Sequence, residues 1–163
     1  MRKWIYLWTV VCMTLVACDV ETSDNGRLDG YWHLTGVDTL ATSGHRDVSD
    51  ETIFWAVQFD LIQLKGADRQ GVGREFYARF DRQDDHLTLY DIHEKNRSAG
   101  DPVVVADSLV VVHPYGIHEM VETFKTLRLG KHEMVLQSPM LRLTFVPSFF
   151  TKTPCRASGS VTH

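Results

Sequence analysis

The chain lacks features that would place it in several common functional classes. Its N-terminal apolar run, Trp4 to Val16, has 13 residues, whereas a transmembrane helix needs roughly 20. It has no basic excess either, since its formal charge is −4 at pH 7. Without a Lys/Arg-rich stripe, a nucleic-acid partner is excluded, and so is adhesion to a membrane surface through basic residues.

The first residues have the pattern of an export signal. A short cationic start, Met1 to Lys3, precedes the apolar run, and small or acidic residues follow it, which predicts a signal peptide over residues 1–17. The string Leu15-Val16-Ala17-Cys18 resembles the lipobox of bacterial lipoproteins, whose cysteine is acylated and becomes the first mature residue. This resemblance implies lipidation at Cys18 and a stable hold on a membrane. An ordinary signal peptide with a cysteine near its cleavage site is the alternative.

Cysteine is scarce, with three in 163 residues. Cleavage would remove Cys12 and lipid would occupy Cys18, so Cys155 would be the one remaining thiol and no internal disulfide could form. Cleavage also removes Arg2 and Lys3, which leaves 15 basic and 21 acidic residues and a charge of −6. Stability must come from a hydrophobic core, which a chain of this length can bury in a single domain.

The segment that follows Cys18 is polar. Residues 19–27 contain Val20 as their one apolar side chain, so we expect residues 18–27 to be a lipidated, flexible tether. Its acidic residues resemble the surface-export signals of some Bacteroidetes lipoproteins. The expected location is therefore the outer membrane, at its periplasmic face or at the cell surface, with both left open.

Alternating apolar and polar residues predict strands. From Leu28 to Val37 the large side chains Leu28, Trp32 and Leu34 share one face. Gly30 lies on the same face and leaves room for backbone to pass close by, as barrel closure requires. From Ile53 to Leu64 the apolar parity shifts, which predicts one long strand with a β-bulge near Asp60 or Leu61.

Further alternating segments predict an antiparallel meander. We expect Asp38 to Thr52 and Ile92 to Pro102 to be polar loops, and Val103 to Val105 with Leu109 to Val112 to form a short hairpin or an edge strand. Residues 150–163 are polar and aperiodic, which indicates a disordered tail. The remaining strands are expected at 76–80, 87–89, 124–129, 134–136 and 140–146.

Four strings in this order resemble lipocalin-like lipoproteins of Bacteroidetes. They are Gly30-x-Trp32, Gln58-Phe59-Asp60-Leu61, Tyr115-Gly116-Ile117 and the closing pair Met134-Val135-Leu136 with Leu141-Arg142-Leu143. The resemblance covers residues 28–149 and implies an all-β, small antiparallel up-and-down barrel whose interior holds side chains or one small ligand. It also implies a cation-π contact between Arg142 of the last strand and Trp32 of the first.

Two functions follow from such a barrel. In the first, the lumen binds a small apolar molecule and opens beside the Asp38 to Thr52 loop, with the end at Trp32 closed. In the second, the same side chains fill the barrel, which then docks a partner protein through its outer surface. The lumen-lining residues expected in either case are Trp55, Phe59, Phe76, Phe80, Leu87 and Phe145.

No pattern of reactive residues indicates catalysis. His113, His118 and Glu119 form one polar group and Asp91, His93 and Glu94 another, but neither has the spacing of a zinc or calcium site. The serines lack a nucleophile-elbow context. We therefore expect a protein that is not an enzyme and has no metal and no cofactor.

Overall fold

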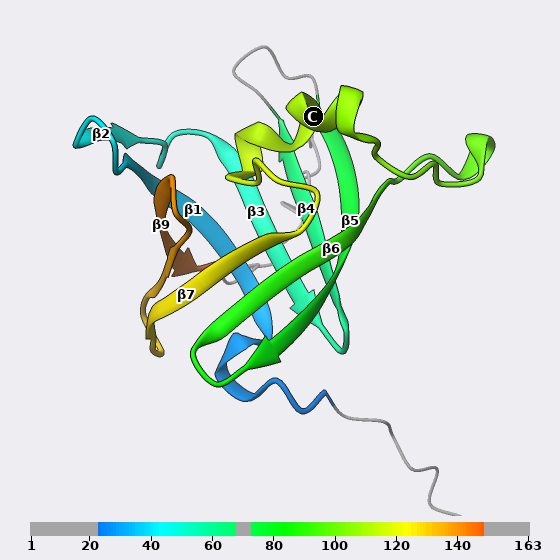
Figure 1. The fold of residues 1–163 in the computed structure, drawn as a ribbon. Coiled ribbons are helices and arrows are strands. Elements are labelled where there is room, and N and C mark those ends of the chain that lie inside the picture. Colours follow the sequence, from blue (N-terminus) through cyan, green and yellow to red (C-terminus); the bar gives the residue numbers. More distant parts are fainter. Residues whose placement is uncertain (1–22, 68–72, 149–163) are drawn as a thin grey trace, which may run out of the picture.

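The computed structural model describes residues 23–67 and 73–148 of the chain. One antiparallel sheet of nine strands runs in the order β2-β1-β3-β4-β5-β6-β7-β8-β9, and β1 also pairs with β9, so that eight strands close into a barrel with β2 attached at its side (Figure 1). This confirms the predicted all-β antiparallel barrel. The strands are β1 (Gly30–Thr39), β2 (Gly44–Asp47), β3 (Thr52–Gln58), β4 (Leu61–Ala67), β5 (Gly73–Gln83), β6 (His86–Glu94), β7 (Glu122–Leu129), β8 (Met134–Gln137) and β9 (Leu141–Pro147).

Strand β1 closes the barrel because it has a partner on each side along its length. Its first half pairs with β3, its second half with β2, and β9 pairs with both halves. The β1–β9 register shifts between Leu34 and Gly36, so that Leu34 and Val37 are both buried although their spacing is odd. The expected loop over residues 38–52 is thus in part a hairpin, since it contains β2.

The predicted long strand over residues 53–64 is wrong. Gln58 pairs with Leu61, so Phe59 and Asp60 form a two-residue turn between β3 and β4 rather than a bulge. A two-residue turn reverses the chain and changes the apolar parity just as a bulge would. Glycine or asparagine, the usual turn residues, do not occur at this position, which is why the parity shift was ambiguous.

The expected hairpin at residues 103–112 is also wrong. Residues Ala106–Tyr115 form a 3-10 helix, η3, which follows an isolated bridge between His93 and Val103. Periodicity cannot distinguish a short apolar run in a strand from one in a helix. Ser108, the third helical residue, caps the start of η3, because its Oγ accepts from the Val105 N–H at 3.1 Å while its own N–H donates to the Val105 carbonyl at 2.8 Å.

A second 3-10 helix, η1 (Gly26–Leu28), precedes β1, and a third, η2 (Arg97–Ala99), lies between β6 and η3. Of the expected flexible tether over residues 18–27, the structure describes Ser23 onward: Ser23 and Asn25 are hydrogen-bonded to Phe59, and Gly26–Leu28 form η1. Cys18, the predicted signal peptide and the predicted tail at residues 150–163 lie outside the described residues. Within those residues, no helix has the length and hydrophobicity needed to span a bilayer.

Candidate functional site

The barrel interior is occupied by aromatic side chains. The rings of Trp55 and Phe145 lie 5.0 Å apart between centroids, and those of Trp55 and Phe124 lie 5.8 Å apart at an angle of 70°. All three side chains are completely buried, as is Phe76. A side chain with no exposed area has no water-sized space beside it, so these residues fill the middle of the barrel.

Helix η3 and the residues after it cover one end of the barrel. The indole Nε1 of Trp55 donates to the Tyr115 carbonyl at 3.2 Å, and the Tyr115 hydroxyl donates to the Arg74 carbonyl. The Tyr115 ring packs edge-on against Phe76, with 5.7 Å between centroids. Burial, with a further contribution from the Glu75 carboxylate, raises the pKa of Tyr115 to about 12.

Gly116 allows this segment to approach the interior. It has φ +84°, a left-handed conformation that glycine adopts without strain, and a Cβ placed there would lie 2.5 Å from Leu143 Cδ1. Its N–H donates to the His113 carbonyl at 2.9 Å and ends η3. The helix is therefore seated directly on the core.

Two histidines stack beside this end. The rings of His113 and His118 lie 4.3 Å apart between centroids. Glu122, which is 3% exposed, accepts the backbone N–H groups of His118 and Glu119, each at 2.8 Å. Burial, followed by the neighbouring His113, lowers the pKa of His118. Sequence reasoning missed Glu122, because nothing in the local pattern distinguishes a buried glutamate from the exposed charges around it.

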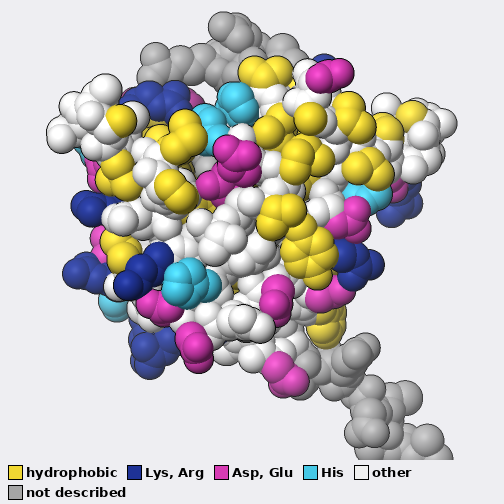
Figure 2. All heavy atoms as spheres, in the orientation of Figure 1, with side chains coloured by type: hydrophobic (Ala, Val, Ile, Leu, Met, Phe, Trp, Pro, Cys, Tyr) yellow, Lys and Arg dark blue, Asp and Glu magenta, His cyan; other side chains and the backbone are white. Residues whose placement is uncertain are grey.

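Apolar side chains are exposed over η3. Figure 2 shows hydrophobic side chains gathered on this part of the surface, and Val105, Val110 and Val121 are each more than half exposed. An exposed apolar patch of this kind is typical of a contact surface.

A groove of about 570 Å³ lies on the outside of the barrel, at the end opposite η3. Tyr31 of β1 and Tyr77 of β5 stand on either side of it, and Phe59 and Leu61 lie at the β3–β4 turn. Sequence reasoning missed this groove, because most of its residues come from four strands that are separated in the sequence, and most of them lie outside the core. Within the described residues, no three His, Cys, Asp or Glu side chains lie close enough together to hold a metal ion.

The comparisons with known proteins identify this architecture. A family model described as a lipocalin-like domain matches residues 12–147. The chain belongs to this lipocalin-like family. A crystal structure of a lipocalin-like protein from Bacteroides uniformis ATCC 8492 is similar to it with a TM-score of 0.57 and 18% identity, and the match covers 76% of this chain and all of that one.

A second solved structure, from Bacteroides eggerthii DSM 20697, matches with a TM-score of 0.56 and 19% identity over 74% of this chain and 98% of that one. At these identities the likeness concerns the lipocalin-like fold alone. No curated protein matches the chain.

Most of the expected lumen residues of the lipocalin-like barrel lie in its interior. Trp55, Phe76, Phe80, Leu87 and Phe145 are buried. Phe59 is a correction: it is 42% exposed in the β3–β4 turn, where its side chain faces solvent. The mouth expected beside residues 38–52 is covered by η3, so Trp55 and Phe76 pack beneath a cap instead of lining an opening.

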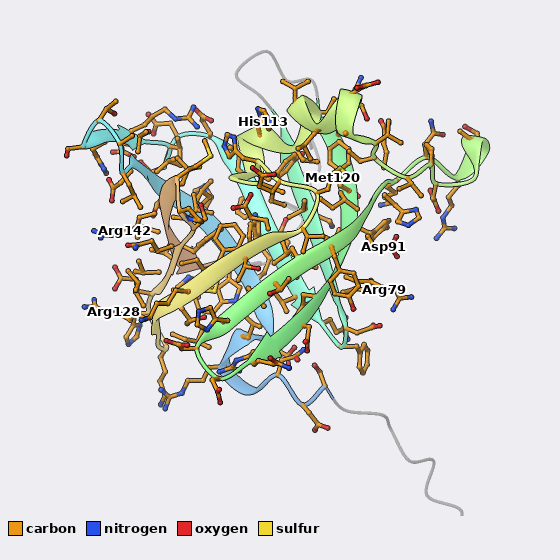
Figure 3. All side chains as sticks on the ribbon, in the orientation of Figure 1. Arg79, Asp91, His113, Met120, Arg128 and Arg142 are labelled. Atoms are coloured by element: carbon orange, nitrogen blue, oxygen red, sulfur yellow. The ribbon has the colours of Figure 1, made fainter. Side chains whose placement is uncertain are left out.

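The expected contact between Arg142 and Trp32 is wrong. Arg142 pairs with Asp38 across the β1–β9 ladder, whereas Trp32 pairs with Pro147. Arg142 lies on the outer face (Figure 3) and donates to Gln137 Oε1 at 3.0 and 3.2 Å. Trp32 is buried next to Gly30, and its Nε1 donates to the Leu28 carbonyl at 2.9 Å.

Proposed function

We propose that this chain is an envelope lipoprotein, held to the outer membrane by acyl groups on Cys18, whose lipocalin-like barrel is a non-enzymatic interaction module. The lipobox-like string before Cys18 supports the anchor, and the family membership supports a binding role. Its location would be the periplasmic face of the outer membrane or the cell surface. Its partner would be another envelope protein.

The filled interior is the observation that carries this proposal. A ligand-binding barrel needs a cavity of roughly 300 Å³ or more. In this chain Trp55, Phe124 and Phe145 occupy the centre with no exposed area, and the Trp55–Tyr115 hydrogen bond closes the end above them. Interaction through the outer surface needs no such cavity, and the valines exposed over η3 offer an apolar contact area.

Membrane fractionation tests the anchor. Cys18→Ser removes the sulfur that would carry the acyl chains, so the variant should leave the membrane fraction or accumulate as the uncleaved precursor. Cys155→Ser is the matched control and should fractionate as the wild type does. A Cys18→Ser protein that stays in the membrane fraction at its wild-type size contradicts the proposal.

An apolar fluorescent probe tests the filled barrel. The wild-type protein should not bind the probe. Native mass spectrometry of the protein purified from its own host should detect no retained small molecule. A bound molecule that is displaced by the probe contradicts the interaction module and favours a ligand carrier.

The ligand carrier is the second candidate, and the nature of η3 favours it. The segment that covers the barrel is a ten-residue 3-10 helix, and runs longer than 3–4 residues are uncommon because their hydrogen bonds have poor geometry. Such a cap could move aside for a small apolar ligand. In that case Trp55→Ala should alter probe binding, while Lys131→Ala, a change in the β7–β8 connection, should leave it unchanged.

A further inference from the structure

We propose that the β3–β4 turn at Phe59 contacts the lipid surface, so that the barrel rests on the membrane by the end opposite η3. This inference rests on the proposed anchor at Cys18 and extends it, because it assigns an orientation and a second membrane contact. The surface consists of Phe59 and Leu61 with the neighbouring tyrosines Tyr31 and Tyr77.

The N-terminal segment brings the anchor to this turn. The Phe59 N–H donates to Ser23 Oγ at 3.0 Å, and Asn25 Nδ2 donates to the Phe59 carbonyl at 2.6 Å. Asp29 Oδ1 accepts from both Ser23 and Asn25, at 2.7 and 2.9 Å. Both backbone groups of Phe59 are thus bound by the residues that follow the anchor.

The distance to the anchor is short. Five residue steps separate Cys18 from Ser23, and an extended chain spans at most about 3.6 Å per residue, or about 18 Å in all. Acyl chains on Cys18 would therefore hold this end of the barrel close to the lipid headgroups. Figure 1 shows η1 and the β3–β4 turn at one end of the barrel and η3 at the other.

The residue at the turn is unusual for its backbone conformation. Five described non-glycine residues have positive φ; four are serine or aspartate, and the fifth is Phe59 at +55°. A bulky side chain in the left-handed region is strained, and such strain persists at sites where function requires the residue. Phe59 is also 42% exposed and Leu61 39% exposed, so the turn presents two apolar side chains to solvent.

The surrounding side chains fit an interface between lipid and water. Tyr31 and Tyr77, on either side of the outer groove, are partly exposed, and tyrosine favours headgroup depth because its ring is apolar and its hydroxyl polar. Asp60, beside Phe59, is ion-paired: its Oδ2 lies 2.5 Å from Nη1 of Arg79, whose Nε also lies 3.5 Å from Asp91 Oδ2. Exposed acidic residues on the chain favour a zwitterionic surface over an anionic one.

Fluorescence quenching by bromine-labelled lipid tests the contact. Phe59→Trp and Val110→Trp are made in the full-length, acylated protein, which is reconstituted in phosphatidylcholine vesicles with and without brominated acyl chains. Val110, 64% exposed on η3, is the matched control at the opposite end. Wild-type protein gives the background from the buried Trp32 and Trp55.

The tryptophan at position 59 should lose most of its fluorescence in brominated vesicles, and the one at position 110 should lose none. If Phe59→Trp disturbs the fold of the β3–β4 turn, Leu61→Trp repeats the test at the neighbouring exposed residue. Vesicle flotation distinguishes a failure of the membrane-facing turn from a failure of the lipid anchor at Cys18. Protein that floats but shows equal quenching at both ends, or none at position 59, overturns the membrane-facing turn alone, whereas protein that does not float overturns the anchor and this inference with it.

Discussion

The two ends of the barrel are both closed, but they are closed by different kinds of contact. At one end η3 is seated on the core through Gly116, with Tyr115 bonded to Trp55 and Arg74. At the other end Trp32 bonds to the Leu28 carbonyl, and the N-terminal segment binds the β3–β4 turn through polar side chains. The η3 end consists of residues inserted between two strands, whereas the other end is closed by the residues that lead into the first strand.

The two ends therefore show two separate features: close packing of buried residues at the η3 end, and backbone strain at an exposed residue at the other. The η3 end relies on a glycine whose conformation is unstrained and whose missing side chain lets backbone and core meet. The opposite end keeps a strained phenylalanine at its surface, where it adds nothing to the core. Changes at the first end should therefore lower stability, and one change at the second should raise it.

The largest effect is expected from the two buried tryptophans. Trp32→Ala and Trp55→Ala each remove a large side chain from a packed interior, which costs about 3 to 5 kcal/mol of the free energy of unfolding. Each also leaves a buried carbonyl, of Leu28 or Tyr115, without its donor. Urea denaturation followed by circular dichroism measures the loss, and a loss below about 1 kcal/mol at either position would contradict the packing described at that end.

Gly116→Ala should have the next largest effect. The left-handed conformation costs an alanine about 1 to 2 kcal/mol, and overpacking against Leu143, which is fully buried, adds about 1 to 3 kcal/mol. Gly100→Ala is the matched control: its φ is +77°, but no atom lies within 4 Å of the added Cβ. The difference in stability between the two variants, taken from their melting curves, measures the cost of the contact between residue 116 and Leu143. Equal losses would show that η3 can shift to accommodate the added methyl group.

Phe59→Asn should stabilise the protein by about 1 kcal/mol, because asparagine tolerates the left-handed region that strains phenylalanine. Leu127→Asn, at another exposed apolar residue but within β7, provides the comparison and should bring no gain. Chemical denaturation checks both. A loss of stability in Phe59→Asn would mean that the aromatic ring packs on the groove strongly enough to offset the strain.

Acidification should have the smallest effect, centred on the stacked histidines. The pKa of His118 is lowered in the folded state, first by burial and then by His113, so the unfolded chain binds more protons near its ordinary pKa of about 6.5. The stability that neutral His118 provides is present above about pH 6.5 and is lost as the pH falls toward the folded pKa.

His93 opposes this trend, because a hydrogen bond to the Asp101 carbonyl raises its pKa and its contribution is lost as the pH rises. Denaturation between pH 5 and 8 should therefore compare the wild type with His118→Gln, which keeps an uncharged polar side chain. The pH dependence should be weaker in the variant, and an unchanged slope would assign it to other groups.

The sequence predicted the parts of this fold that depend on local alternation. Trp32, Trp55, Phe76 and Leu87 are buried where parity placed them, because one buried face constrains every second residue of a strand. Strand β9, which closes the barrel, was predicted from the same alternation of apolar and polar residues.

Other parts depend on contacts that local patterns do not contain. A turn of Phe59 and Asp60 has no glycine or asparagine to mark it, and the valines of η3 suit a strand as well as a helix. The cover over the barrel arises from Gly116 meeting Leu143, 27 positions later. The outer groove likewise combines four strands. The alternation of apolar and polar residues therefore predicted which side chains face inward, but it could not distinguish an open barrel from a filled one.

The closure of β1 on β9 also constrains the order in which the protein folds. Trp32 pairs with Pro147, so the β1–β9 ladder joins residues 115 positions apart, whereas each of β3 to β6 pairs with its neighbour in the sequence. Contacts between distant residues form slowly, because the chain loses loop entropy before they are made. The meander should form first and leave one edge of β1 unpaired until β9 reaches it.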